Sequence, residues 1–232
     1  MGGKEEKLKK ILLVAATESE AEAFRKIDGI KPSAGGFVFR DLEIIPLVTG
    51  VGSVATSWTM TKWISSNPKP DLAVNIGIAG SYREEIRIGE VVVPVSDCFA
   101  DAGIETADGF HTLSEAGLQD PDKFPFKEGK IIAENSYIKK ASGHFKTVSA
   151  ITVNSASGSQ PTIDRLIKKY NPGIETMEGA TFFYICSGES IPFLSLRSVS
   201  NMVEPRNKGK WNIPLALDSL SERLEELFLL FI

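Results

Sequence analysis

Carboxylate side chains follow strand-like segments at two places in this sequence. Glu18, Glu20 and Glu22 come directly after an apolar run. Glu178 lies between a short strand-like stretch and a segment with helical periodicity. A carboxylate at such a junction can activate a water molecule as a general base, or accept hydrogen bonds from hydroxyl groups of a ligand. Glutamates are also common in the first turn of a helix, where they interact favourably with the helix dipole. The residues alone leave both explanations open.

Two glycine clusters also follow predicted strands, Thr-Gly-Val-Gly-Ser at 49–53 and Asn-Ile-Gly-Ile-Ala-Gly-Ser at 75–81. Glycine permits positive φ and lets a ligand approach backbone N–H groups closely. The first cluster lacks the third glycine of a dinucleotide fingerprint, and neither is followed by the Lys-Ser/Thr of a P-loop. In open α/β sheets, ligands bind outside the carboxyl ends of the strands, where both clusters are predicted to lie. Tight strand-to-helix turns without a ligand are the alternative.

The elements that must position these residues can be predicted from hydrophobic periodicity. Short apolar runs rich in β-branched residues lack strict alternation, which is typical of strands buried on both faces. They alternate with segments of helical periodicity. This order predicts an α/β fold, a three-layer α/β/α sandwich around a central mixed, twisted sheet. The predicted strands are 11–16, 42–49, 72–78, 91–95, 148–153 and 193–199, and the predicted helices are 18–27, 54–65, 160–169, 179–186 and 214–231.

The composition is that of an ordinary folded protein, with 232 residues of which 42% are hydrophobic and 24% charged. It predicts one domain spanning 1–232. The net charge of -4 offers no basic surface for nucleic acid. Two cysteines and two histidines without a metal-ligand spacing predict neither disulfides nor a metal site. We therefore expect a reducing, cytoplasmic location and no nucleic-acid partner.

Two further segments bear on the class of protein. The apolar C-terminal segment 220–232 carries charges at helical spacing, so we expect a packed amphipathic helix and no membrane partner. The first apolar run is too short for a signal or membrane segment. Residues from Ala102 to Lys130 are rich in Gly, Asp and Pro and predict a long excursion from the sheet, of the kind that often covers a site or a partner subunit.

The segment Ile-Glu-Thr-Met-Glu-Gly-Ala at 174–180 resembles the Met-Glu-Gly/Ala signature of the purine nucleoside phosphorylase and nucleosidase superfamily. Supporting matches occur in the same order at the first strand, at 75–80, at 157–159 and at 196–201, so the resemblance covers nearly the whole chain. It implies a nucleoside phosphorylase-like α/β sandwich that assembles as a homo-oligomer. It also implies a small nucleoside substrate, no metal or organic cofactor, and water as the nucleophile.

Within that superfamily, the segment Ser-Asn-Met-Val-Glu-Pro-Arg-Asn at 200–207, together with Trp211, resembles the futalosine hydrolase family more than the methylthioadenosine nucleosidases. The resemblance implies hydrolysis of the N-ribosidic bond of a hypoxanthine nucleoside in an alternative menaquinone route. Cleavage of this bond builds a cation-like ribose and pushes electrons into the base, so an enzyme must stabilise the sugar, neutralise the base and deliver water.

The family motif assigns these roles to particular residues. Glu178 would accept hydrogen bonds from both ribose hydroxyls, with Met177 packed on the ribose face. Glu20 falls at the position of the general base, and the choice among Glu18, Glu20 and Glu22 stays open. The adenosine-cleaving nucleosidases carry an aspartate where this chain has Asn201. An amide can donate to N7 or to a 6-oxo oxygen and is a poor proton donor, which suits hypoxanthine. An Asx turn is the alternative for Asn201.

The remaining candidates are substrate-binding residues implied by the same resemblance. The base is expected against the backbone near Thr152, Val153 and Asn154, with Gly80 in the second glycine cluster. Arg197 would support the site by pairing with a carboxylate, or form a structural ion pair. Futalosine bears an aromatic carboxylate on the 5′ side of its ribose. Arg206 and Trp211 are candidates to bind this group, and a surface loop with a packed tryptophan is the alternative.

Three other functions are less well supported by the residues. Phosphorylases of the superfamily bind phosphate with an arginine at the position that Asn75 occupies here, so hydrolysis is favoured over phosphorolysis. A methylthioadenosine or adenosylhomocysteine nucleosidase is disfavoured by Asn201. A nucleoside-binding protein without activity is disfavoured because Glu20, Glu178 and Asn201 occur together, although fold alone does not fix function.

Overall fold

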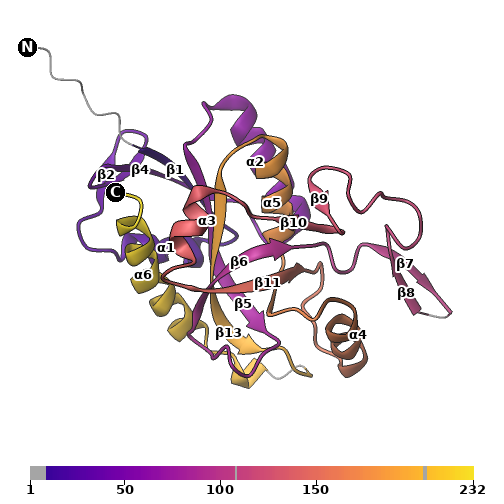
Figure 1. The fold of residues 1–232 in the computed structure, drawn as a ribbon. Coiled ribbons are helices and arrows are strands. Elements are labelled where there is room, and N and C mark those ends of the chain that lie inside the picture. Colours follow the sequence, from indigo (N-terminus) through magenta and orange to yellow (C-terminus); the bar gives the residue numbers. More distant parts are fainter. Residues whose placement is uncertain (1–8, 108, 206–207) are drawn as a thin grey trace, which may run out of the picture.

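The computed structural model describes residues 9–107, 109–205 and 208–232 (Figure 1). Within this part of the chain, eleven strands form one mixed sheet. These strands are β1 (Lys9–Ala15), β2 (Lys31–Ser33), β3 (Gly36–Phe39), β4 (Leu42–Val48), β5 (Leu72–Ser81), β6 (Val91–Asp97), β9 (Phe126–Lys127), β10 (Lys130–Ile132), β11 (Lys146–Thr152), β12 (Ile174–Thr176) and β13 (Phe193–Met202).

All six strands predicted from the apolar runs are present, as β1, β4, β5, β6, β11 and β13. The two central strands β5 and β13 continue past their predicted ends, to Ser81 and Met202. The second glycine cluster therefore lies inside β5, and its expected position in a turn after the strand is wrong. The physical reason is close packing, because a side chain at Gly77 would collide with side chains that cross over the strand.

Part of the sheet closes on itself. β5 pairs in parallel with β13, and β13 pairs antiparallel with β6. β6 pairs with β11, β11 with β12, and β12 with β5. These five strands form a closed ring of hydrogen-bonded neighbours, while β1 and β4 extend the sheet from β5 as parallel strands. Because parallel strands end at the same edge, the carboxyl ends of β1, β5 and β13 come together.

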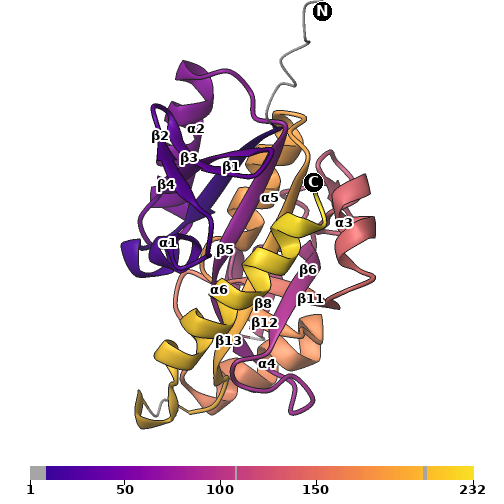
Figure 2. The same cartoon turned by 90° about the vertical axis from the view of Figure 1, so that its left-hand side faces the viewer.

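Helices cover both faces of the sheet, which confirms the predicted sandwich (Figures 1 and 2). α1 and α6 pack against each other and against β5, while α2 and α5 pack together on the other side. α5 is buried along most of its length because it lies against the ring, where Phe182 packs edge to face on Phe193 and the ring of Phe183 lies tilted against it. The helices are α1 (Glu18–Arg25), α2 (Ser53–Ser66), α3 (Ser136–Ala141), α4 (Gln160–Tyr170), α5 (Gly179–Gly188) and α6 (Ile213–Leu229).

The excursion expected between 102 and 130 begins with a hairpin outside the main sheet. Among the described residues, β7 (Gly103–Thr106) and β8 (Gly109–Thr112) pair only with each other, and they project to one side of the molecule (Figure 1). A short 3-10 turn, η1 (Lys208–Lys210), precedes α6. None of the helices in the described part of the chain is long and apolar enough to cross a membrane.

Candidate active site

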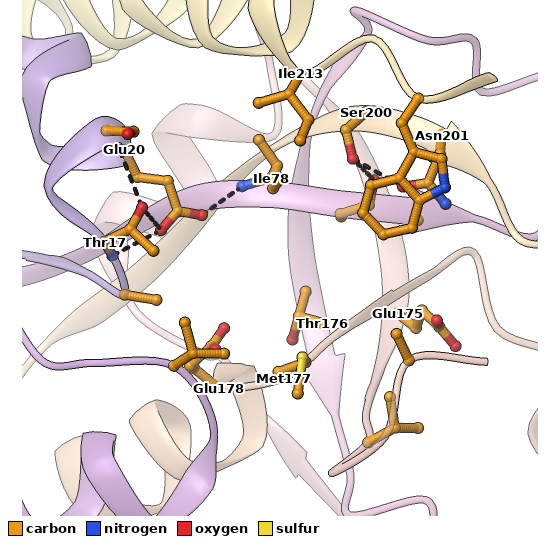
Figure 3. Close-up of a pocket in the computed structure, with 18 of the residues that line it drawn as sticks. Thr17, Glu20, Ile78, Glu175, Thr176, Met177, Glu178, Ser200, Asn201 and Ile213 are labelled. Atoms are coloured by element: carbon orange, nitrogen blue, oxygen red, sulfur yellow. Dashed lines mark hydrogen bonds between the residues drawn. The ribbon is translucent and has the colours of Figure 1, made fainter. Parts of the chain in front are cut away.

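A cavity of about 350 Å³ opens at the carboxyl ends of β1, β5, β12 and β13. This volume lies within the range of small-molecule sites, and the position is the one where α/β sheets bind ligands. Glu20 and Glu178 lie on one side of the cavity, and Glu175 and Asn201 lie on the other (Figure 3). The lining also includes Thr17, Val51, Ile78, Gly80, Val153, Ser157, Met177, Ser200, Trp211 and Ile213.

Glu20 is the one of the three N-terminal glutamates that faces the cavity, since Glu18 and Glu22 are exposed on α1. Its carboxylate closes a capping box, in which Oε2 accepts hydrogen bonds from the N–H and the hydroxyl of Thr17, each at 3.0 Å. Oε1 accepts from the N–H of Ile78 at 3.0 Å. The capping box and the strand therefore hold this carboxylate in one orientation at the cavity wall.

Glu178 is the N-cap residue of α5, but its side chain does not cap the helix. Its Oε1 instead accepts a hydrogen bond from the N–H of Gly52 at 2.8 Å, across the cavity floor. Gly52 has φ of 90°, a conformation that glycine adopts readily, so the first glycine cluster provides the turn that aims this N–H at Glu178. Burial raises the pKa of Glu178, although the Arg197 charge and the Gly52 N–H oppose this shift.

Arg197 is 1% exposed and lies beneath the cavity rather than in its lining. Its Nε donates to Ser195 Oγ at 3.1 Å and its Nη2 donates to Asn75 Oδ1. Arg197 and Glu20 both cross over Gly77, where a Cβ atom would lie 2.6 Å from Glu20 Oε1. Burial raises the pKa of Glu178, and the positive charge of Arg197 opposes that rise. This charge therefore offsets the cost of burying negative charge at the cavity floor.

Asp97 is a buried carboxylate that the sequence analysis did not single out. It ends β6 and is 1% exposed, and its Oδ1 accepts from the N–H of Cys98 at 2.8 Å and from Thr152 Oγ1 at 3.0 Å. A Cβ atom at Gly179 would collide with Asp97 Oδ2, so this carboxylate lies against the start of α5. Burial raises the pKa of Asp97 to about 7. Its sequence signal was a carboxylate directly after a buried apolar run.

Asn201 lies at the opposite end of the cavity from Glu20 (Figure 3). Its Oδ1 accepts a hydrogen bond from Ser200 Oγ at 2.8 Å, and its Nδ2 donates to Met202 O at 3.0 Å. The amide group is therefore fixed with its oxygen toward Ser200. The second N–H of Nδ2 remains as a donor toward a ligand.

Two of the three residues expected along the edge of the base do not line the cavity. Thr152 is buried, with its hydroxyl bonded to Asp97 and to the N–H of Ala180. Asn154 lies at the surface, where its side chain and N–H bond Asp101. Val153 lines the cavity with its side chain, while its N–H donates to Thr176 O at 3.0 Å. The backbone N–H groups of these three residues are thus already bonded within the protein.

The other expected binding residues fall into two groups. Gly80, Met177 and Trp211 line the cavity. Trp211 is 36% exposed, which places its ring at the mouth. Arg206 lies outside the described residues. Glu175 is a further lining residue that the sequence analysis did not assign. Its signal was a carboxylate in the strand-like stretch before Glu178.

Residues 10–232 match the family model of the phosphorylase superfamily. The chain belongs to this superfamily. It is 31% identical over 159 residues to the futalosine hydrolase of Streptomyces coelicolor, an alignment covering 68% of this chain and 65% of that protein. It is 27% identical to the futalosine hydrolase of Thermus thermophilus, covering 90% of this chain and 88% of that protein.

A nucleosidase of the superfamily is similar to the same degree. The chain is 27% identical to the 5'-methylthioadenosine/S-adenosylhomocysteine nucleosidase of Buchnera aphidicola, covering 89% of this chain and 91% of that protein. The solved structure of the futalosine hydrolase of Helicobacter pylori superposes with a TM-score of 0.76 at 18% identity, covering 95% of this chain and 97% of that one. These matches confirm the predicted fold and the predicted resemblance to the superfamily.

Proposed function

We propose that this chain hydrolyses the N-ribosidic bond of a 6-oxopurine nucleoside, with futalosine as the substrate and hypoxanthine as the released base. The observation that carries the proposal is the convergence of Glu20, Glu178 and Asn201 on one cavity. The similarity to futalosine hydrolases over most of the chain supports the same substrate. Such a reaction would belong to an alternative menaquinone route.

The proposed reaction needs one water molecule and no cofactor. Glu20 accepts a proton from the water, whose oxygen forms a bond to C1′ of the ribose while the C1′–N9 bond breaks. Both electrons of that bond move into the base, which then takes up a proton from solvent. Asn201 donates a hydrogen bond to N7 or O6 of the base and so stabilises the developing negative charge.

Glu178 acts on the sugar in this proposal. A carboxylate can accept hydrogen bonds from both ribose hydroxyls at once, and its negative charge stabilises the cation-like ribose. Its hydrogen bond from Gly52 fixes one oxygen in advance, so little reorganisation is needed when substrate binds. Met177 is the next residue in the cavity wall and would pack on the ribose face. Trp211 at the mouth would contact the aromatic 5′ group.

The test is base release in buffer without phosphate. Futalosine, inosine and methylthioadenosine are offered separately to wild type, to Glu178→Gln and to the surface variant Glu18→Gln. We expect hypoxanthine from futalosine with wild type and Glu18→Gln, and a loss of about 10²-fold or more in kcat with Glu178→Gln. A requirement for phosphate would contradict hydrolysis. Binding of futalosine without release of any base would instead indicate a nucleoside-binding protein.

A methylthioadenosine or adenosylhomocysteine nucleosidase is the second candidate function. The similarity to the Buchnera enzyme, at nearly the same identity as to the Thermus futalosine hydrolase, favours it. The orientation of Asn201 speaks against it, because its fixed amide presents an N–H donor and cannot readily protonate the base. Adenine release from methylthioadenosine in the same assay would decide for this second function.

We also propose that the chain works in the cytoplasm as a homo-oligomer. Val51 lies before α2, and Val54 and Trp58 lie in its first two turns; they expose 56%, 83% and 71% of their surface. Large apolar side chains gathered at one place are typical of a protein–protein contact. Val51 also lines the cavity, so a second copy packed here would cover the site. A monomer mass in sedimentation would contradict this assembly.

A further inference from the structure

The start of α5 is capped by side chains at the ends of two strands and not by its own N-cap residue. The N-cap residue is Glu178, whose side chain makes no capping hydrogen bond. The first N–H of the helix, at Gly179, donates to Thr176 Oγ1 of β12 at 3.1 Å. The second, at Ala180, donates to Thr152 Oγ1 of β11 at 2.7 Å. Two donors that a helix end leaves without an intrahelical partner are thus satisfied by strand residues.

Asp97 holds the hydroxyl of Thr152 in place. Asp97 ends β6, which pairs with β11, and its Oδ1 accepts the hydrogen bond of this hydroxyl at 3.0 Å. A hydroxyl group has one proton and two lone pairs, so the bond to Asp97 leaves the lone pairs for the N–H of Ala180. Asp97 Oδ2 lies over Gly179, where a Cβ atom would collide with it. The carboxylate therefore orients the cap and requires glycine at the first position of the helix.

This arrangement leaves the side chain of Glu178 free to point away from its own helix. Its Oε1 accepts from the N–H of Gly52 at 2.8 Å, and the residue lines the cavity. In many helices the N-cap side chain itself accepts from the second or third N–H. Ala180 is 0% exposed, so without the Thr152 hydroxyl its N–H would be a buried donor in need of a partner. The carboxylate of Glu178, at the N-cap position, is placed to become that partner.

The hydrogen bond of Asp97 and its charge can be separated by substitution. Burial raises the pKa of Asp97 to about 7, although its hydrogen bonds and the charge of Arg197 oppose this shift. A protonated carboxyl group still accepts through its carbonyl oxygen. An Asn side chain has the same acceptor and carries no charge, so Asp97→Asn retains the partner of the Thr152 hydroxyl.

We propose that Asp97 and Thr152 are positioning residues for Glu178, because they cap α5 in its place and leave its carboxylate free for the ribose. Neither residue lines the cavity, so both act only through Glu178. A single capping bond shifts an equilibrium by about fivefold to thirtyfold. Without it, the share of Glu178 that faces the ribose falls by a factor of that order. The inference rests on the proposed nucleosidase activity and adds two positioning residues to it.

The experiment replaces the capping hydroxyl with a methyl group of similar shape, in Thr152→Val. We expect kcat/KM for futalosine and for inosine to fall about fivefold to thirtyfold in buffer without phosphate. The affinity for free hypoxanthine, measured by calorimetry, should match wild type, because the free base has no ribose for Glu178 to bind. A general loosening of the cavity would instead lower kcat/KM and hypoxanthine affinity together.

Two control variants separate the cap from packing. Thr152→Ser keeps the hydroxyl and should keep the wild-type kcat/KM. Thr181→Val removes another buried hydroxyl from the first turn of α5, one without a hydrogen-bond partner among the described residues, and should also keep the wild-type value. If Thr152→Val does not fold, Asp97→Ala removes the acceptor of the Thr152 hydroxyl and should lower kcat/KM in the same way. Asp97→Asn should restore it.

The outcomes that overturn the inference differ from those that overturn the proposed function. A folded Thr152→Val or Asp97→Ala protein with the wild-type kcat/KM overturns the positioning role. A parallel loss of hypoxanthine affinity does the same, since it indicates packing alone. A wild-type protein that cleaves no nucleoside overturns the proposed function, and the positioning role with it. If wild type cleaves methylthioadenosine instead, the same variants should lose kcat/KM for that nucleoside and keep their affinity for adenine.

Discussion

Replacing Asp97 with Asn should make the stability of the protein less dependent on pH. Asp97 is fully buried against the start of α5, and burial raises its pKa from 3.8 to about 7 in the folded protein. The Asn side chain has nearly the same shape, and its oxygen can still accept from Cys98 and Thr152. The substitution therefore removes the charge while keeping the packing.

The sign and the size of the effect follow from proton linkage. Because the folded-state pKa of Asp97 is raised, the folded protein holds a proton that the unfolded chain has released in the range between the two pKa values. The resulting stability is fully present below the unfolded pKa and is lost as the pH rises through about 7. Integrated from about pH 6 to about pH 8, this one group lowers the free energy of unfolding by about 1.4 kcal/mol.

The assay is urea denaturation of wild type and Asp97→Asn at about pH 6 and about pH 8. Wild type should lose about 1.4 kcal/mol more than the variant between the two conditions. The contributions of the other titrating groups to the free energy of unfolding cancel in this difference. Asp28→Asn, an exposed aspartate on the surface, serves as the control and should follow wild type. Parallel pH dependence of wild type and Asp97→Asn would refute the assigned pKa.

Two further predictions concern Glu20 and the glycine beneath it. Glu20→Gln should lower kcat by about 10²–10⁴-fold with little change in melting temperature, since Gln also completes a capping box. The control Glu18→Gln should keep the wild-type kcat and melting temperature. A wild-type kcat in Glu20→Gln would exclude Glu20 as the general base. Gly77→Ala should destabilise the fold by about 1–3 kcal/mol, because its Cβ meets the buried Arg197 and Glu20 side chains. Thermal melts compare Gly77→Ala with Gly188→Ala, where a Cβ meets nothing within 4 Å. Equal stability of the two variants would contradict the predicted clash at Gly77.

The order of strands and helices could be predicted from the sequence because it depends on local periodicity. The strands β1, β5 and β6 contain apolar runs that are buried on both faces. Each predicted helix begins within a residue of its observed start. The short strands β2, β9 and β10 were not predicted, since two or three residues carry no periodic signal. The predicted end of β5 lies too early in the chain, because glycines in a sequence indicate a turn unless the tertiary packing around them is known.

The candidate site was only partly contained in the sequence. The motif at 174–180 and Asn201 indicate a nucleosidase-type site from the sequence alone. The choice of Glu20 over its two neighbours depended on which face of α1 packs toward β5. Asp97 has no local feature that separates it from a carboxylate at a solvated strand end. Its burial arises only when α5 packs over β6.

The sequence by itself determined the fold class, the superfamily and the acidic character of the site, because these follow from periodicity and contiguous motifs. Only the tertiary structure decided that Glu175, Gly80 and Asn201 stand in one row. They are far apart in the chain, and strand register, which is set by packing of the whole sheet, brings them together. The lining of the cavity is thus a property of the folded ring of strands.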